Sequence, residues 1–320
     1  MQTTRDVPKL TESANILARP FTRSFYNFAR DIKLLHSAFA LPFAASAFLF
    51  LDTTELLDAL TLRKVILLIG CMIGARSFAM GFNRFADRHI DRVNPRTKVR
   101  QIPSGGLAAG HGLMWTILSG LLLVIGAFLL SPLAGWLSLP LMMVLAGYSF
   151  GKHLTLLVHW YLGVCLGFAP VAVQIALVGK PTTSVLLIGT AVAFWTAGFD
   201  ILYSLQDMVF DRKMGLKSVP ARFGTKGALI ISRMSFTVMA ILLSAAGVMT
   251  SRGVLYFSGV AVVSGILAYE HWIVRHTDKS GNSPNINAAF FNWNAAVSII
   301  FFIMALADVL WAGGAGHFHG

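Results

Sequence analysis

Nine long apolar runs constrain this chain more than any other feature of its sequence. Each is close to the roughly 17–25 residues that an α-helix needs to cross a bilayer. They lie at 34–51, 65–86, 112–130, 132–150, 154–178, 183–206, 227–249, 252–274 and 288–312, with only Ser131 and Pro132 dividing the third from the fourth. Charged residues make up 12% of the chain, whereas soluble domains have about a quarter. We therefore expect an all-α polytopic membrane protein with nine transmembrane helices.

The two ends of the chain differ in composition from its apolar middle. Residues 1–33 are polar and basic, with room for a short interfacial helix and no sign of a cleavable signal sequence. Residues 34–312 are expected to form the transmembrane domain, and 313–320 a flexible tail; weak metal binding by His317 and His319 is the less favoured alternative. Cys71 and Cys165 lie inside predicted spans, so we expect neither a disulfide framework nor a zinc site.

Two acidic motifs with the same spacing lie on two of these runs. They are Asn83-Arg84-x-x-Asp87-x-x-x-Asp91 and Asp200-x-x-Tyr203-x-x-x-Asp207-x-x-x-Asp211. A four-residue step turns a helix by about 400°, so each motif points a column of carboxylates in one direction. Acids at the end of a transmembrane helix are costly and usually functional. Because Mg²⁺ commonly sits between protein carboxylates and substrate phosphates, two facing columns predict a metal–diphosphate site. Alternatively, the acids only form salt bridges with nearby arginines.

Basic residues are distributed unevenly between the two sides of the predicted bundle. With nine spans, one side receives the basic tail, the segments Arg84 to Arg100 and Arg212 to Lys226, Lys152, Arg275 and Lys279. The other side receives only Arg63, Lys64, Lys180 and Arg252. Short loops rich in Lys and Arg stay in the cytoplasm, so the rich side and both acidic motifs are predicted to be cytoplasmic. The net charge of +12 is mainly this topology signal, and nucleic acid is not an expected partner.

Each acidic motif is followed by a loop of similar composition. Residues 92–105 and 212–224 both carry cations beside Ser or Thr, followed by Pro and Gly. This similarity indicates a weak internal repeat in which each half supplies one acidic helix end and one basic loop. Cations over two acidic columns are what a metal-bound diphosphate requires, although the same residues also fit ordinary cytoplasmic loops.

Two further polar positions lie inside or beside the spans. Arg76 is seven residues before Asn83, two turns deeper on the same face, and an arginine at that depth needs a partner or a polar cavity. It can serve an anionic substrate group such as a carboxylate, or only partners within the bundle. Tyr148, Lys152 and Thr155 form a polar cluster at a cytoplasmic turn.

Taken together, these motifs resemble the UbiA-type intramembrane prenyltransferase superfamily over nearly the whole chain. The similarity rests on the two acidic motifs, on Arg76, and on the loops from Arg96-Thr97 to Pro103-Ser104-Gly105 and at Gly215-x-Lys217-Ser218. Residues 36–43, 269–271 and 287–294 are similar to the 4-hydroxybenzoate polyprenyltransferase branch, although Leu35 stands where many relatives have an acid.

This resemblance implies nine helices around a central cavity, dependence on Mg²⁺, and transfer of a polyprenyl chain to an aromatic acid. The implied acceptor is 4-hydroxybenzoate or a dihydroxynaphthoate, in ubiquinone or menaquinone biosynthesis. The implied metal ligands are Asp87, Asp91, Asp207 and Asp211, supported by Asn83 and Asp200. The implied substrate-binding residues are Arg76, Arg96, Arg100, Lys152, Tyr203 and Lys217.

The chemistry fits these residue types. An allylic diphosphate ionises when metals and cations stabilise the leaving group, and an apolar cavity keeps the allylic cation from water. Two other functions also place acids on membrane helices. A CDP-alcohol-type phospholipid synthase has an Asp-Gly pair that Asp87-Arg88 and Asp91-Arg92 do not supply. An ion-coupled transporter has its acids near the midplane, whereas these are predicted at the cytoplasmic ends.

Overall fold

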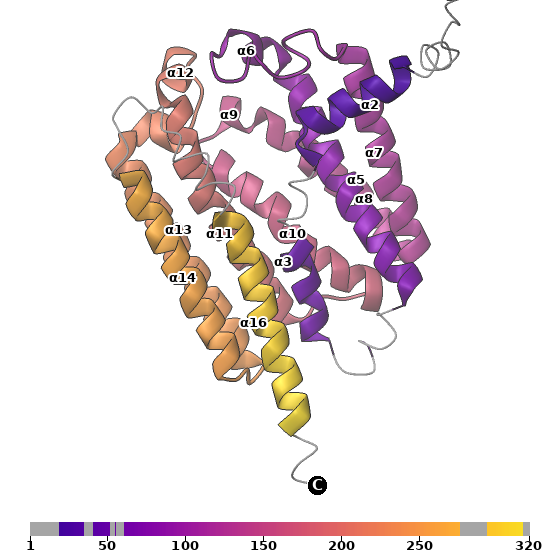
Figure 1. The fold of residues 1–320 in the computed structure, drawn as a ribbon, viewed down its shortest axis with the longest axis vertical. Helices are drawn as coiled ribbons and strands as arrows, with labels where there is room; N and C mark the ends of the chain where they lie inside the picture. Colours follow the sequence, from indigo (N-terminus) through magenta and orange to yellow (C-terminus); the bar gives the residue numbers. More distant parts are fainter. Residues whose placement is uncertain (1–18, 35–40, 52–54, 56–60, 276–292, 316–320) are drawn as a thin grey trace, which may run out of the picture.

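The fold is a bundle of membrane-length helices. The computed structural model describes residues 19–34, 41–51, 55, 61–275 and 293–315, and no strand is found in these ranges. Figure 1 shows the long helices side by side, with the short helices α6 (Arg88–Val93) and α12 (Met208–Lys213) at the same end. We call this the acidic end, because both acidic motifs finish there. The expected all-α membrane fold is confirmed.

Eight helices within the described residues are long and apolar enough to cross a membrane. They are α5 (Leu62–Ala86), α7 (Ala109–Leu130), α8 (Pro132–Gly147), α10 (Val158–Val178), α11 (Thr183–Ser204), α13 (Val219–Met249), α14 (Val254–Arg275) and α16 (Asn294–Ala315). Short helical segments continue two of these helices. Helix α8 is followed by η3 (Tyr148–Phe150) and α9 (Gly151–Leu154), and α11 is followed by η4 (Leu205–Asp207) and then α12. Each corresponds to one of the apolar runs in the sequence.

The expected count of nine spans is not confirmed. The run at 34–51 is described only in part, because residues 35–40 lie outside the described ranges; its visible portion is α3 (Leu41–Ser46) followed by η2 (Ala47–Phe50). Ten residues of helix extend about 15 Å, roughly half of the hydrocarbon thickness. Two carbonyls near the end of this piece are hydrogen-bonded to the bundle. The side-chain amide nitrogen Nε2 of Gln174 donates to the Ala47 carbonyl at 3.1 Å, and the Arg252 guanidinium donates to the Leu49 carbonyl.

Hydroxyl side chains start several of the long helices. Ser131 accepts from the Ala134 amide at 3.1 Å, and Pro132 occupies the first position of α8, so a single residue separates α7 from α8. Such caps satisfy amides that have no partner inside the helix. Ser218 caps α13 in the same way, by accepting from the Ala221 amide at 3.3 Å. The division of the run at 112–150 into two helices therefore has a local cause.

Two helices meet through their backbones. A Cβ added to Gly163 or Gly167 of α10 would lie 2.1 or 2.3 Å from carbonyl oxygens of Ala193 and Gly189 in α11. Small residues allow such close approach in membrane bundles, where burial of apolar surface supplies little driving force. Any larger side chain at these two glycines would separate α10 from α11.

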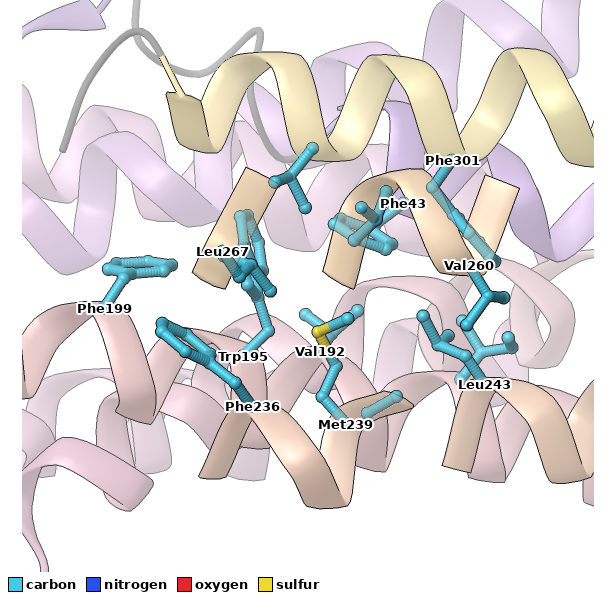
Figure 2. Packing of buried hydrophobic residues seen from close by; sticks show 14 of the residues in the cluster. Phe43, Val192, Trp195, Phe199, Phe236, Met239, Leu243, Val260, Leu267 and Phe301 are labelled. Carbon is cyan, nitrogen blue, oxygen red and sulfur yellow. The ribbon is translucent and has the colours of Figure 1, made fainter. Parts of the chain in front are cut away.

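Helix α11 is the centre of the bundle. Most of its length is buried, whereas the other spanning helices keep most of their surface outward. Figure 2 shows the apolar core around it, in which Trp195 and Phe199 of α11 lie near Phe236 of α13 and Leu267 of α14. The second acidic motif therefore begins on the most tightly enclosed helix.

An amphipathic helix precedes the bundle. Helix α2 (Arg19–Asp31) packs against α7, where Phe21 lies 4.7 Å from Trp115 between ring centroids and Ser24 accepts from the Trp115 indole at 3.1 Å. Its end also holds the first basic loop, since Asp31 accepts from the Gln101 amide at 2.8 Å. A helix does form within residues 1–33; its position at a membrane interface and the proposed domain boundaries stay predictions.

Candidate active site

Both acidic motifs line one cavity of about 570 Å³ at the acidic end. The cavity wall includes eleven of the twelve residues singled out from the sequence: Arg76, Asn83, Asp87, Asp91, Arg96, Arg100, Lys152, Asp200, Tyr203, Asp207 and Asp211. The twelfth, Lys217, is outside this wall; its Nζ donates to the Leu154 carbonyl at 2.9 Å. Because the Lys217 amide also donates to the Lys152 carbonyl at 2.7 Å, this residue braces the turn that carries Lys152.

The helix that carries each motif breaks at its middle aspartate. Asp87 ends α5 and begins α6 with φ −84° and ψ 1°, and Asp207 ends η4 and begins α12 with φ −96° and ψ −2°. These angles lie in the sparsely populated bridge region that often holds active-site residues. The straight columns expected from the spacing are therefore bent in the same way in both halves, which agrees with the internal repeat.

In the first motif, the polar side chains are oriented by one another. Arg84 donates to the Asn83 amide oxygen at 3.1 Å, which leaves Asn83 Nδ2 to donate to Asp87 at 2.8 Å. Asp91 pairs with Arg100 at 2.6 Å. Within the described residues no ion pair involves Asp87, and burial followed by the charge of Asp91 raises the pKa of Asp87. Asp87 is thus the carboxylate most open to an added cation.

The second motif is held mainly by residues from the first half of the chain. Arg96 donates through Nε to Asp207 Oδ1 at 2.8 Å and through Nη2 to Oδ2 at 2.5 Å, and its Nη1 donates to the Tyr203 hydroxyl at 3.1 Å. Asn94 adds a hydrogen bond to Asp207 at 3.2 Å. Burial lowers the pKa of Arg96, but the hydrogen bond and charge of Asp207 outweigh burial and hold that pKa above its usual range. These contacts with Asp207 join the first half of the chain to the second.

The remaining acids of the second motif have different partners. Asp211 is buried and pairs with Lys152 at 3.2 Å. Asp200 is hydrogen-bonded to the fully buried His159, whose Nδ1 lies 2.7 Å from Asp200 Oδ2. The Val219 amide donates to His159 Nε2 at 3.2 Å, so Nδ1 must carry the proton and donate to Asp200. His159 thereby links Asp200 to the start of α13.

Sequence reasoning did not single out His159 or Asn94. A histidine within an apolar span was an available signal, because polar groups inside a membrane need partners. Asn94, which directly precedes Pro95, had no comparable signal.

Arg76 is a buried cation of the cavity wall. It projects from α5, and its Nε is buried with no hydrogen-bond partner among the described residues. The same cavity is also lined by the apolar residues Leu162, Trp195 and Phe199. A buried guanidinium donor without a partner is costly, so Arg76 is suited to an anionic ligand group.

The donor set fits a hard divalent cation. The cavity is lined by six aspartates and the Asn83 amide, all oxygen ligands of the kind that Mg²⁺ prefers; four of the aspartates are the expected ligands Asp87, Asp91, Asp207 and Asp211. In the described part of the chain, no three His, Cys, Asp or Glu side chains are close enough to hold an ion together. Mg²⁺ usually takes only one or two carboxylates and completes its shell with water and substrate phosphates. The arrangement therefore fits a metal that is shared with a phosphate ligand.

Comparisons with known proteins found a matching family and similar sequences. The model of the UbiA prenyltransferase family matches residues 40–296. A 4-hydroxybenzoate octaprenyltransferase of Aromatoleum aromaticum is 29% identical over 244 residues, covering 75% of this chain and 80% of the relative. A protein of the same description from Azoarcus sp. is 30% identical over 218 residues, covering 68% of this chain and 75% of the relative.

Solved structures show the same architecture. The apo structure of a UbiA homolog from Aeropyrum pernix K1 superposes with a TM-score of 0.75 at 29% identity, covering 86% of this chain and 98% of that one. A UbiA homolog from Archaeoglobus fulgidus bound to GPP and Mg²⁺ has a TM-score of 0.64 at 19% identity, covering 88% of this chain and 99% of that one. This second similarity concerns the fold.

Proposed function

The chain belongs to the UbiA prenyltransferase family, and we propose that it transfers a polyprenyl group from a polyprenyl diphosphate to an aromatic acid. The proposed acceptor is 4-hydroxybenzoate or a dihydroxynaphthoate, in quinone biosynthesis. The observation that carries this proposal is the meeting of both acidic motifs and three loop cations in one cavity that also has apolar lining, including Leu162, Trp195 and Phe199. The names of the relatives from Aromatoleum and Azoarcus support the choice of acceptor.

The carboxylates of the two motifs are proposed to hold Mg²⁺ together with the diphosphate. Asp87 and Asp91 serve from one half, and Asp207 and Asp211 from the other. When bound, the metal neutralises charge that develops on the diphosphate as its bond to the allylic carbon breaks. Asn83 orients Asp87 through its amide hydrogen bond. Asp200 is kept in place by the donated proton of His159.

Three cations are proposed to bind the diphosphate oxygens. Arg96, Arg100 and Lys152 each pair with an aspartate here, at 2.5, 2.6 and 3.2 Å respectively. A metal that takes those carboxylates would leave the cations available for phosphate oxygens, to which an arginine can donate two parallel hydrogen bonds. The cations stabilise charge on the leaving group, which is the largest single contribution expected in such a reaction.

The apolar wall and Arg76 are proposed to receive the rest of both substrates. Trp195 and Phe199 exclude water from the allylic cation, which water would otherwise consume. The Arg76 guanidinium would bind the carboxylate of the aromatic acid in a bidentate pair. That contact holds the electron-rich ring beside the allylic carbon. A ring carbon bonds to the allylic carbon as the diphosphate leaves, and the ring then loses its proton, ultimately to solvent.

The protein is proposed to lie in the cytoplasmic membrane with the acidic end facing the cytoplasm. The excess of Lys and Arg at this end supports the orientation, because basic short loops stay on the cytoplasmic side. The prenyl donor is amphiphilic, so a site at this level allows its diphosphate to remain near water while its chain lies in the bilayer.

Turnover by purified protein tests the proposal. Wild type supplied with Mg²⁺, a prenyl diphosphate and either aromatic acid should form a prenylated product that mass spectrometry detects. Asp87→Ala and Asp207→Ala should each abolish product. Because Asp207 is buried and accepts from Arg96 and Asn94, Asp207→Asn, which keeps a carbonyl acceptor for these donors, is the second variant that removes the charge and should leave folded protein without turnover. The double variant should be no worse than either single one, because both columns serve one cluster. Substantial turnover by either single variant at saturating Mg²⁺ would refute the assignment.

A further inference from the structure

A second hollow lies on the outer surface between α13 and α14, separate from the cavity of the acidic motifs. Its volume is about 440 Å³ and its lining includes Arg233, His271 and Arg275 beside apolar residues such as Phe236 and Leu267. The two lining sets have no residue in common. We call this hollow the α13–α14 groove.

One end of the groove lies near the acidic end of the bundle, because its lining includes Arg275, the last residue of α14. His271 Nε2 is 2.8 Å from the Leu229 carbonyl, which places Leu229 and His271 at the same level of the antiparallel pair. Arg275 is one helical turn nearer the acidic end than His271, and Arg233 is one turn further from it than Leu229. Their Cα atoms are thus separated by about 12 Å along the axis at 1.5 Å per residue. The Arg233 side chain can extend toward the interface, which shortens this separation and brings its guanidinium toward the level of His271 and Arg275.

The charge of this groove is unbalanced. Arg233 is exposed on a spanning helix, where a lipid-facing arginine is expensive unless it meets an anion or reaches the interface. No ion pair among the described residues involves Arg233 or Arg275. Helix α13 contains no acid, and the one acid of α14, Glu270, is buried and accepts from Asn294 at 3.3 Å. Among the residues that the structure describes, the groove therefore presents positive charge without a counter-charge on α13 or α14.

The remaining lining is suited to an amphiphile. Trp272, which also lines the groove, is exposed and stacks on Tyr269 with ring centroids 5.9 Å apart. Tyrosine and tryptophan favour the membrane–water interface, where one side of the ring meets lipid and the other meets polar groups. Phe236 and Leu267 provide an apolar floor below the two arginines. Inorganic phosphate would use the charges but not this floor.

We propose that the α13–α14 groove binds an anionic phospholipid. Its phosphate accepts hydrogen bonds from Arg233 and Arg275, and one acyl chain lies along Phe236 and Leu267. Basic pockets between transmembrane helices on the cytoplasmic side commonly hold anionic headgroups. A zwitterionic lipid is a poorer ligand, because its headgroup cation would meet two arginines. The bound lipid crosslinks α13 to α14 and so stabilises the half of the bundle that follows the second acidic motif.

The test measures lipid binding to full-length protein purified in mild detergent. Thermal unfolding and native mass spectrometry are recorded with phosphatidylglycerol, phosphatidylcholine or glycerol phosphate. Phosphatidylglycerol should raise the melting temperature of wild type and remain bound, because a ligand that binds only the folded state stabilises it. In the Arg233→Gln/Arg275→Gln double variant, the affinity for phosphatidylglycerol should fall by about tenfold or more, since two charge-assisted contacts are lost.

Two further variants separate this site from general attraction to a protein of net charge +12. Arg222→Gln removes an exposed arginine of α13 outside the groove and should bind phosphatidylglycerol as wild type does. Ala268→Trp keeps both charges but fills the groove, and should lose the bound lipid. Equal binding by wild type and the double variant would overturn the proposal. So would equal stabilisation by phosphatidylcholine, or by glycerol phosphate alone, which would indicate an anion site rather than a lipid site.

Discussion

Arg96 should compete with the metal for Asp207, and this competition can be measured without turnover. The guanidinium of Arg96 covers both oxygens of Asp207, at 2.8 and 2.5 Å. A cation that coordinates Asp207 must displace this fork. Arg96→Gln removes the charge and the second donor arm while keeping a polar side chain, so Asp207 becomes available to metal at lower cost.

The size of the effect follows from the contacts. Hydrogen bonds to charged groups contribute about 1.5–3 kcal/mol each. The Arg96 side chain is 29% exposed whereas that of Asp207 is 7% exposed, so solvent screens part of the pair, and the two bonds together are worth about 1.5–3 kcal/mol. Since about 1.4 kcal/mol is a factor of ten, metal should bind to Arg96→Gln roughly tenfold to a hundredfold more tightly in the absence of diphosphate.

Mn²⁺ titration followed by electron paramagnetic resonance provides the assay, with Mn²⁺ in place of Mg²⁺. Diphosphate binding should weaken in the same variant, because Arg96 is then missing as a phosphate ligand. Arg92→Gln is the matched control: Arg92 lies in the same basic loop, is exposed, and does not line the cavity. Unchanged or weaker Mn²⁺ binding by Arg96→Gln, with Arg92→Gln like wild type, would refute the competition.

Three other outcomes are expected. Arg76→Lys keeps the charge but loses the planar fork, so the KM for the aromatic acid should rise far more than the KM for the prenyl diphosphate; equal KM values would remove Arg76 as the acceptor's anchor. Lys33 lines the same cavity, so its ammonium group is expected to attract the diphosphate. Burial, reinforced by nearby arginines, lowers the pKa of Lys33 to about 8, so Lys33 gains its charge only as pH falls through that value. Diphosphate affinity measured between about pH 9 and about pH 7 should therefore increase more in wild type than in Lys33→Gln, and parallel profiles would contradict this role. Cysteines at Lys98 and Lys217 should react with a membrane-impermeant thiol reagent only from the cytoplasmic side, and one at Lys180 only from the other; labelling of all three from one side would contradict the proposed topology.

Most of the fold could be predicted from the sequence because the bilayer fixes helix length. Eight apolar runs became helices, most of whose ends lie within four residues of those expected; α13 begins at Val219, before the expected 227, and α16 at Asn294, after the expected 288. Ser131 followed by Pro132 divided α7 from α8 by ordinary capping. The exception is the run at 34–51. Hydropathy reports only the length and composition of an apolar run. It does not report contacts with residues distant in sequence, such as those of Gln174 and Arg252 that hold the described end of this run.

The candidate site was predictable in its composition but not in its pairing. Spacing placed the acids on one face, yet a four-residue step does not reveal that the helix bends at Asp87 and Asp207. The contact of Arg96 with Asp207 joins residues 111 positions apart, and only the packed bundle determines it. The contact of Lys217 with Leu154 likewise depends on how two loops meet, which explains why a residue expected at the diphosphate braces a turn instead.

The ion pairs of the cavity cannot all form at the same stage of synthesis, because their partners are separated by different lengths of chain. Asp91 and Arg100 are 9 residues apart and can pair as soon as their loop has left the ribosome. Lys152 must wait for Asp211, 59 residues later, and Arg96 for Asp207, 111 residues later. Until α12 has been made, the first half of the nascent chain therefore holds two cations whose partners do not yet exist. A chain that stalls before this point would keep them exposed at the membrane surface, where folding chaperones and membrane proteases can distinguish it from the finished protein.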